Sequence, residues 1–245
     1  CFNVFATLLL LPFSKLLEKL ACLTVKEVKD PKKEKIEQEL LLLDERFLET
    51  PALAVEHCKV VANHMAEITK EALEYSMDLL QGYDETLMEK IFELESEADQ
   101  FEDHLGQYLV KLSSKDHSVK DSAALSMLFH CIGDMERISD HAVNIAESAE
   151  EMHQKNLAFS AEGAREIATF ADAVREILRL SLESFIKEDM DEAVLVEPLE
   201  EVVDDLRDEL KKRHVNRLRE GKCTIELGFV LSDLTTNFER VADHC

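Results

Sequence analysis

The sequence is poor in helix-breaking residues, with 6 Gly and 4 Pro among 245 residues, about a third of their average usage. This scarcity disfavours turn-rich β architectures and favours long helices. Positive charge is also scarce, because 28 Lys and Arg face 52 Asp and Glu and leave a formal net charge of -24. Phosphate contacts need clustered positive charge, so nucleic acid is excluded as a partner.

Motifs for common enzyme chemistry are missing as well. The sequence contains no Gly-rich phosphate loop, no Gly-x-Ser-x-Gly elbow and no Cys/His nucleophile pattern. An oxidative di-iron site in a four-helix bundle needs Glu-x-x-His on two helices, and only Glu150-x-x-His153 matches. We therefore expect a protein that is not an enzyme.

Long helical patterns fill the sequence from Thr50 onward. Thr50-Pro51 is a helix start, and a second helix is expected from about Asp84. Ser118 and Asp121 have capping-box spacing before a third helix. The stripes of the second and third helices are Ile91, Leu94, Ala98, Phe101, Leu105 and Tyr108, and Leu125, Leu128, Ile132, Met135, Ser139, Ala142 and Ala146. Three long helices with short connections predict an antiparallel bundle.

A second copy of this unit follows the first. A shift of about 105 residues places Glu95 on Glu200 and Asp99 on Asp204, and a shift of about 103 aligns the third helices. The sequence therefore predicts an all-α fold of two tandem antiparallel three-helix bundles, over residues 51–157 and 158–245, the second truncated at its end. Pro198 falls inside an expected helix of the second copy and should kink it or mark a new start.

Each copy carries Glu-x-x-x-Asp on its second helix and again on its third. The four pairs are Glu95/Asp99, Glu136/Asp140, Glu200/Asp204 and Glu239/Asp243. In so acidic a chain, roughly 11 pairs at this spacing arise by chance, and most such pairs are solvated surface. All four, however, lie on the same flank of their apolar stripe, where neighbouring helices meet. We therefore expect two quartets of carboxylates.

Crowded carboxylates favour a bound cation or retained protons, because repulsion and desolvation are otherwise severe. Oxygen-only ligands suit Mg²⁺, Mn²⁺, Ca²⁺ or iron, so the eight paired residues are candidate metal ligands. Further candidates are Asp134, Asn144, Glu147, Asp103 and Asp208. For each of these five, a solvated or capping role is the plain alternative.

The chain begins with an apolar run, Phe2 to Leu11, followed by Pro12 and basic residues. The run is too short to span a bilayer, which needs about 20 apolar residues. It fits the end of a membrane helix (residues 1–22), and a core or amphipathic helix is the alternative. Residues 23–50 resemble a charged linker with a lead-in helix.

The acidic motifs resemble those of a known family. GDMERISDHAVNIAE, from Gly133 to Glu147, and NFERVADHC, from Asn237 to Cys245, resemble the third-helix signature of PhoU-like proteins. LESEAD and LEEVVD resemble the matching second-helix motifs. The resemblance covers about residues 52–245, and implies two pseudo-symmetric three-helix bundles and multinuclear metal clusters at the acidic motifs.

The first part of the chain resembles a junction in bacterial sodium/phosphate cotransporters. FNVFATLLLLPF followed by LDERFLETPALA, from Leu43 to Ala54, is similar to the point where the last membrane helix leads to a PhoU-like domain. This resemblance implies a regulatory domain of a sodium-dependent phosphate (anion) symporter, located at the cell membrane with residues after about 22 in the cytoplasm. The implied partners are the transport domain of the same chain, phosphate, sodium and a possible second copy in a homo-oligomer.

Three other interpretations stay open. The chain could be a free-standing PhoU-like regulator of phosphate signalling, a metal-free helical interaction scaffold, or a metalloenzyme.

Overall fold

The computed structural model describes residue 36 and residues 38–245, and Leu40–Cys245 form one compact unit. The unit begins with two short 3-10 helices, η2 (Leu41–Leu43) and η3 (Glu45–Glu49). The α-helices that follow are α4 (Pro51–Leu79), α5 (Glu85–Ser113), α6 (Val119–Gln154), α7 (Ala161–Lys187), the single turn α8 (Met190–Ala193), α9 (Val196–Arg219) and α10 (Ile225–Asp243). The described part of the chain contains no strand, so the prediction of an all-α fold is confirmed. The predicted membrane-helix remnant lies outside the described residues.

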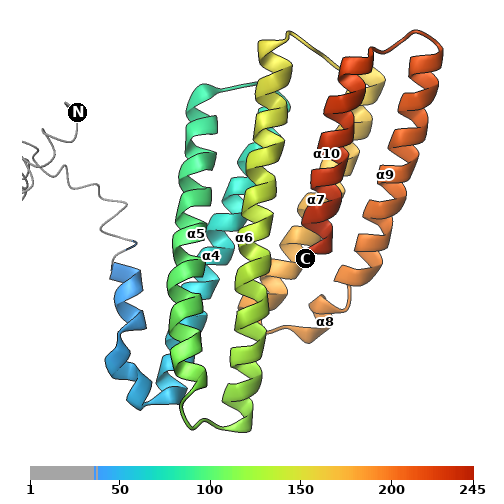
Figure 1. Ribbon diagram of the computed structural model, residues 1–245. Helices are drawn as coiled ribbons and strands as arrows, with labels where there is room; N and C mark the ends of the chain where they lie inside the picture. The colour runs from blue at the N-terminus through green and yellow to red at the C-terminus, as the bar shows by residue number, and fades with distance from the viewer. Residues whose placement is uncertain (1–35, 37) are drawn as a thin grey trace, which may run out of the picture. The chain divides into compact units, whose positions relative to one another are not determined.

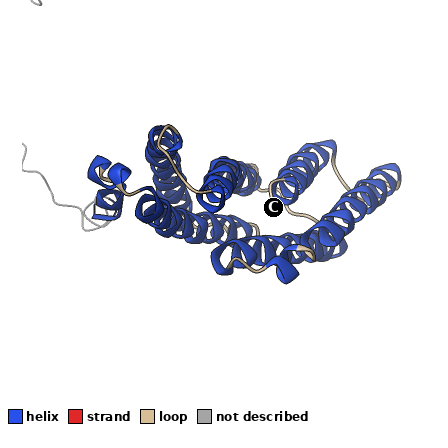
Figure 2. Cartoon of the chain, turned by 90° about the horizontal axis from the view of Figure 1, so that it is seen from below, coloured by secondary structure: helices blue, strands red, loops and turns tan. Residues whose placement is uncertain are grey.

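The long helices form two three-helix bundles. Helices α4, α5 and α6 pack on one another, and α7, α9 and α10 do the same. The bundles are joined by contacts between α4 and α7 and between α6 and α10. Figures 1 and 2 show α5, α6, α10 and α9 side by side in one layer, with α4 and α7 in a second. The two-bundle architecture predicted from the repeat is therefore confirmed.

The apolar stripes become the core. Every residue of the stripes predicted for the second and third helices is buried. The capping box also forms, because the Ser118 side chain accepts from the Asp121 amide while the Asp121 side chain accepts from the Ser118 amide. In the second bundle, Phe170 and Phe238 are fully buried with ring centroids 5.2 Å apart, which ties α7 to α10.

Pro198 marks a new helix start, one of the two outcomes expected from its position. The helix that matches α5 is divided into the single turn of α8 and the longer α9, which begins at Val196 and has Pro198 in its first turn. A proline is tolerated there because the first amides of a helix have no partner within the helix. Helix α9 is therefore shorter than α5, and its acidic motif lies near its beginning.

The contact between α6 and α10 repeats itself about a pseudo-two-fold axis. His141 Nδ1 lies 2.9 Å from Asn237 Oδ1, and His244 Nδ1 lies 3.1 Å from Asp134 Oδ1. The two histidines occupy equivalent positions in the two repeats, as do Asp134 and Asn237. Their rings stack with centroids 5.9 Å apart. Since α6 and α10 run in opposite directions (Figure 1), the third-helix motif of one repeat contacts the same motif of the other repeat.

Candidate functional site: two acidic seams

The first acidic seam consists of five carboxylates on neighbouring helices. Its members are Glu95, Asp99 and Glu102 of α5 and Glu136 and Asp140 of α6. The three glutamates are half-buried and the two aspartates are exposed. The helical spacings of three and four residues place the members of each helix on one face. The first predicted quartet thus lies on two adjacent helices, together with a fifth carboxylate.

The negative charges of the first seam act on its three glutamates. Burial raises the pKa of Glu95, and the negative charges of Asp140 and Asp99 raise it further. Burial also raises the pKa of Glu136, followed by the charges of Asp140, Glu102 and Asp99, while Arg137 acts in the opposite direction. The first seam therefore concentrates negative charge from both helices.

Glu102 is the member that the sequence analysis missed in favour of its neighbour Asp103. Asp103 is exposed, whereas Glu102 is half-buried beside Asp99. Burial raises the pKa of Glu102, and the charges of Asp103 and Asp99 add to the effect. The signal was present in the spacing, because Glu102 follows Asp99 by three residues and Glu95 by seven, and these steps keep one helical face.

Within the described part of the chain, no Lys, Arg or His forms an ion pair with any of the five. The nearby Arg137 instead lies 3.6 Å from Asp134. The described residues also contain no group of three or more His, Cys, Asp or Glu side chains already arranged to hold a metal ion. The first seam thus has the oxygen donors that a hard cation prefers, but they do not already surround a position for one.

The second acidic seam contains an arginine among its carboxylates. It consists of Glu200, Asp204 and Arg207 of α9 and Glu239 and Asp243 of α10. Arg207 Nη1 lies 3.1 Å from Asp204 Oδ1 and also donates to Glu239. Its Nε donates to the exposed Asp208 over 3.2 Å. One guanidinium therefore contacts three carboxylates from two helices.

The remaining carboxylates of the second seam differ in their surroundings. Asp243 lies 3.3 Å from Arg240 of its own helix. Burial raises the pKa of Glu200, followed by the charges of Asp204 and Asp243. The predicted second quartet thus lies around Arg207, and three of its four carboxylates contact an arginine.

The other candidate ligands lie away from these seams or on their rims. Asp134 forms a hydrogen bond with His244 at the contact between α6 and α10. Asn144 and Glu147 line a hollow of about 270 Å³ between the same two helices, with Glu151 and Asp233. Asp103 and Asp208 are exposed, and Asp208 pairs with Arg207.

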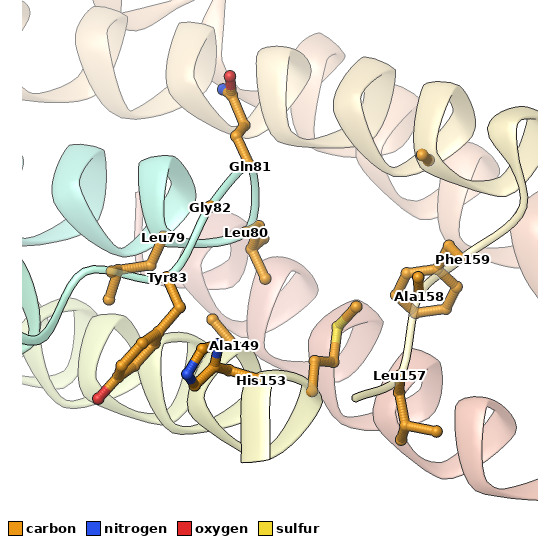
Figure 3. A pocket seen from close by; sticks show the side chains of 12 residues that line it. Leu79, Leu80, Gln81, Gly82, Tyr83, Ala149, His153, Leu157, Ala158 and Phe159 are labelled. Atoms are coloured by element: carbon orange, nitrogen blue, oxygen red, sulfur yellow. The ribbon is translucent and has the colours of Figure 1, made fainter. Parts of the chain in front are cut away.

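A separate pocket lies at the ends of α4 and α6 (Figure 3). Its volume is about 290 Å³, and its walls are mostly apolar. Of the residues that line it, only Tyr83 and His153 carry a titratable group, and their rings stack at 4.6 Å. The pocket has no lining carboxylate, so it is a poor candidate for binding a hard cation.

The fold and the seams together define an all-α protein of two three-helix bundles with acidic motifs at equivalent helices. A PhoU domain model matches residues 62–149 and 167–245. The chain belongs to the PhoU domain family. The two matched segments correspond to the two bundles, so the family repeat and the structural repeat coincide.

Similar known proteins support this assignment. The chain is 24% identical over 181 residues to phosphate-specific transport system accessory protein PhoU homolog 1 of Thermotoga maritima, covering 74% of this chain and 77% of that protein. It is 26% identical over 219 residues to a PhoU homolog of the same description from Synechocystis, covering 89% of each. The crystal structure of PhoU from Pseudomonas aeruginosa shares the fold, with a TM-score of 0.72, 20% identity and coverage of 77% of this chain and 90% of that one.

The predicted cell-membrane location is corrected by these comparisons. The matched relatives are named as accessory proteins of a transport system and not as transporters. In the part of the chain that the structure describes, no helix is both long enough and apolar enough to cross a bilayer. The apolar run from Phe2 to Phe13, on which the membrane prediction rested, lies outside that part.

Proposed function

We propose that this protein is a PhoU-type accessory regulator of phosphate transport that acts by binding other proteins and catalyses no reaction. The supporting observation is the match of the PhoU domain model to both bundles. The names of the relatives, which refer to a phosphate-specific transport system, point in the same direction. They favour the alternative of a PhoU-like regulator over the domain of a sodium-dependent symporter. Sodium and a homo-oligomeric partner stay predictions that no comparison addresses.

We further propose that the first acidic seam binds a hard cation such as Mg²⁺, Mn²⁺, Ca²⁺ or iron. The support is the gathering of five carboxylates on two helices without an ion-pair partner among the described residues. A bound cation would supply positive charge that offsets their mutual repulsion. Glu95 and Glu136 are half-buried and Asp99 and Asp140 exposed, so ligands from both helices would face a cation that enters from solvent. Binding would hold α5 and α6 together.

Phosphate uptake in cells tests the regulatory role. In a strain that lacks the gene, we expect uptake of radiolabelled phosphate to stay high when phosphate is plentiful, and the full chain should restore the decrease. Uptake that responds to phosphate equally with and without the gene would contradict the proposal. A variant with Val174→Asp, which places a charge in the core of the second bundle, is a negative control for complementation.

Thermal unfolding tests the cation site independently. Mn²⁺ should raise the melting temperature of the full chain, because a ligand that binds only the folded state at 100 times its Kd adds about 2.7 kcal/mol. The D99N/D140N variant should lose this increase while melting in chelator no lower than the wild type, since two repelling charges are removed. An equal Mn²⁺ effect in both proteins would contradict the assignment.

A further inference from the structure

The two seams differ at one matched position in a way that changes their charge. The shift of about 105 residues that places Glu95 on Glu200 and Asp99 on Asp204 also places Glu102 on Arg207. A carboxylate in the first seam therefore corresponds to a guanidinium in the second. This single difference changes the local charge by two units.

Arg207 is held inside the second seam and does not extend into solvent. Its side chain is 19% exposed, and that of its partner Glu239 on the facing helix is 25% exposed. Asp204 and Asp208 on its own helix complete the set of contacts. A guanidinium stays charged at every pH that proteins tolerate, so this positive charge is permanent.

A metal ion at the second seam would have to compete with this side chain. Asp204 and Glu239, two of the four predicted ligands, already contact Arg207, and a third, Asp243, lies beside Arg240. A divalent cation would also be repelled by the guanidinium, and removing one partner from a partly buried pair is costly. The second seam therefore lacks the unpaired carboxylates that the first seam offers to a metal ion.

We propose that Arg207 is a built-in cation that replaces metal at the second acidic seam, so that the chain takes up metal only at the first. The inference rests on the proposed cation site between α5 and α6. It makes the two bundles unequal: the first responds to metal, whereas the second is held together without it. Metal availability would then change the state of one bundle only.

Reciprocal substitutions with Mn²⁺ as the probe test this inference. The number of Mn²⁺ ions bound per full chain is measured by titration calorimetry and elemental analysis. In the wild type, D99N/D140N should abolish uptake and D204N/D243N should leave it unchanged. E102R should weaken binding at the first seam at least about tenfold, because a positive charge replaces a negative one. R207E should add a second binding event that D204N/D243N removes.

Controls separate the charge of the seam from the charge of the whole molecule. Arg165→Glu, at an exposed position of α7, changes the net charge as R207E does and should add no binding event. If R207E does not fold, Arg207→Gln keeps a polar side chain without the charge. This variant should melt lower than the wild type in chelator and recover on addition of Mn²⁺.

The outcomes distinguish this inference from the proposal on which it rests. Wild-type uptake that D204N/D243N reduces would overturn the role of Arg207 while leaving the first seam intact. Absence of uptake in the wild type together with uptake by R207E would support Arg207 but remove the first-seam site. If neither protein binds Mn²⁺, both proposals are wrong.

Discussion

At the scale of single residues, burial determines which charged groups influence the stability of the fold. Most ion pairs between the described residues lie in solvent, where such pairs contribute about 0–1 kcal/mol. The titratable side chain of His214 on α9, in contrast, is buried. It is only 5% exposed, and Cys223 Sγ lies 3.6 Å from its Nδ1. A Cβ added at Gly228 of α10 would lie 3.0 Å from its Nε2. The absence of a side chain at Gly228 therefore lets α10 approach the ring closely.

The burial of His214 predicts that the free energy of unfolding decreases in acid. Burial and, to a smaller extent, the charge of Arg217 lower the pKa of His214 from 6.5, while Glu166 acts in the opposite direction. His214 therefore binds a proton near pH 6.5 in the unfolded chain, but only at lower pH in the folded chain. The contribution of neutral, buried His214 to the free energy of unfolding is full above pH 6.5 and is lost as the pH falls below it. Urea unfolding at about pH 7.5 and about pH 5.5 should show a smaller decrease for His214→Gln than for the wild type.

A matched control for this experiment is His130→Gln, at an exposed position of α6. Its unfolding free energy should follow that of the wild type across the same pH range. If His214→Gln loses as much stability on acidification as the wild type does, another group carries the effect and the assignment to His214 is wrong.

At the scale of the helix, local signals in the sequence were reliable. The stripes of α5 and α6 and the capping box at Ser118 were predicted correctly, because spacing and capping depend on neighbours within one or two turns. Arg207 was not predicted as a member of the second seam. Its role depends on which α10 carboxylate faces it, and that is decided by packing between segments distant in sequence. Each acidic pair lies on one face of its own helix, as the spacing of four residues predicts, whereas its role as a metal ligand stays a prediction.

The capping box predicts a measurable loss on truncation. Ser118→Ala should reduce the unfolding free energy by about 1 kcal/mol, because the Asp121 amide loses its acceptor. Ser126→Ala, at an exposed position in the same helix, should cause no loss, since alanine is the better helix former. Equal stability of the two variants in denaturant titrations would contradict the role of the cap.

Helices α7 and α9 are linked by an ion pair that is largely removed from water. Arg217 Nη1 lies 2.8 Å from Glu166 Oε2, with side chains 9% and 12% exposed, although Oε2 accepts no hydrogen bond. Arg213 Nη1 lies 3.4 Å from Glu166 Oε1. Glu166→Gln would leave the buried charge of Arg217 without its counterion, and we expect a loss of about 3–5 kcal/mol.

The exposed pair of Lys155 with Glu151, at 2.6 Å, is the comparison for this variant. Glu151→Gln should change the unfolding free energy by less than about 1 kcal/mol. Similar losses for Glu166→Gln and Glu151→Gln in urea titrations would show that burial does not strengthen the link between α7 and α9.

At the scale of the whole molecule, the two bundles meet through equivalent surfaces. The pairs His141 with Asn237 and His244 with Asp134 repeat one contact about the pseudo-two-fold axis. A duplicated sequence predicted equivalent bundles, but it could not show that the third helices of the two copies face each other. The partner of a helix depends on which apolar surface remains uncovered after each bundle forms.

A double-mutant cycle measures this contact between the bundles. His141→Ala and Asn237→Ala should be coupled by about 0.5–1.5 kcal/mol, the contribution of one hydrogen bond. His141→Ala with the distant, exposed Asn156→Ala should show additive effects. Additive effects for both combinations would mean that the polar contact does not join the bundles energetically.

In our proposal the first seam takes up a cation, whereas the second seam contains its own positive charge in Arg207. Anomalous diffraction from crystals of the full chain grown with Mn²⁺ distinguishes the two seams, because it locates the metal without any substitution. We expect an anomalous peak at bonding distance from Asp99 and Asp140, and none beside Arg207. A peak among Asp204, Glu239 and Asp243, or no peak between α5 and α6, would contradict it.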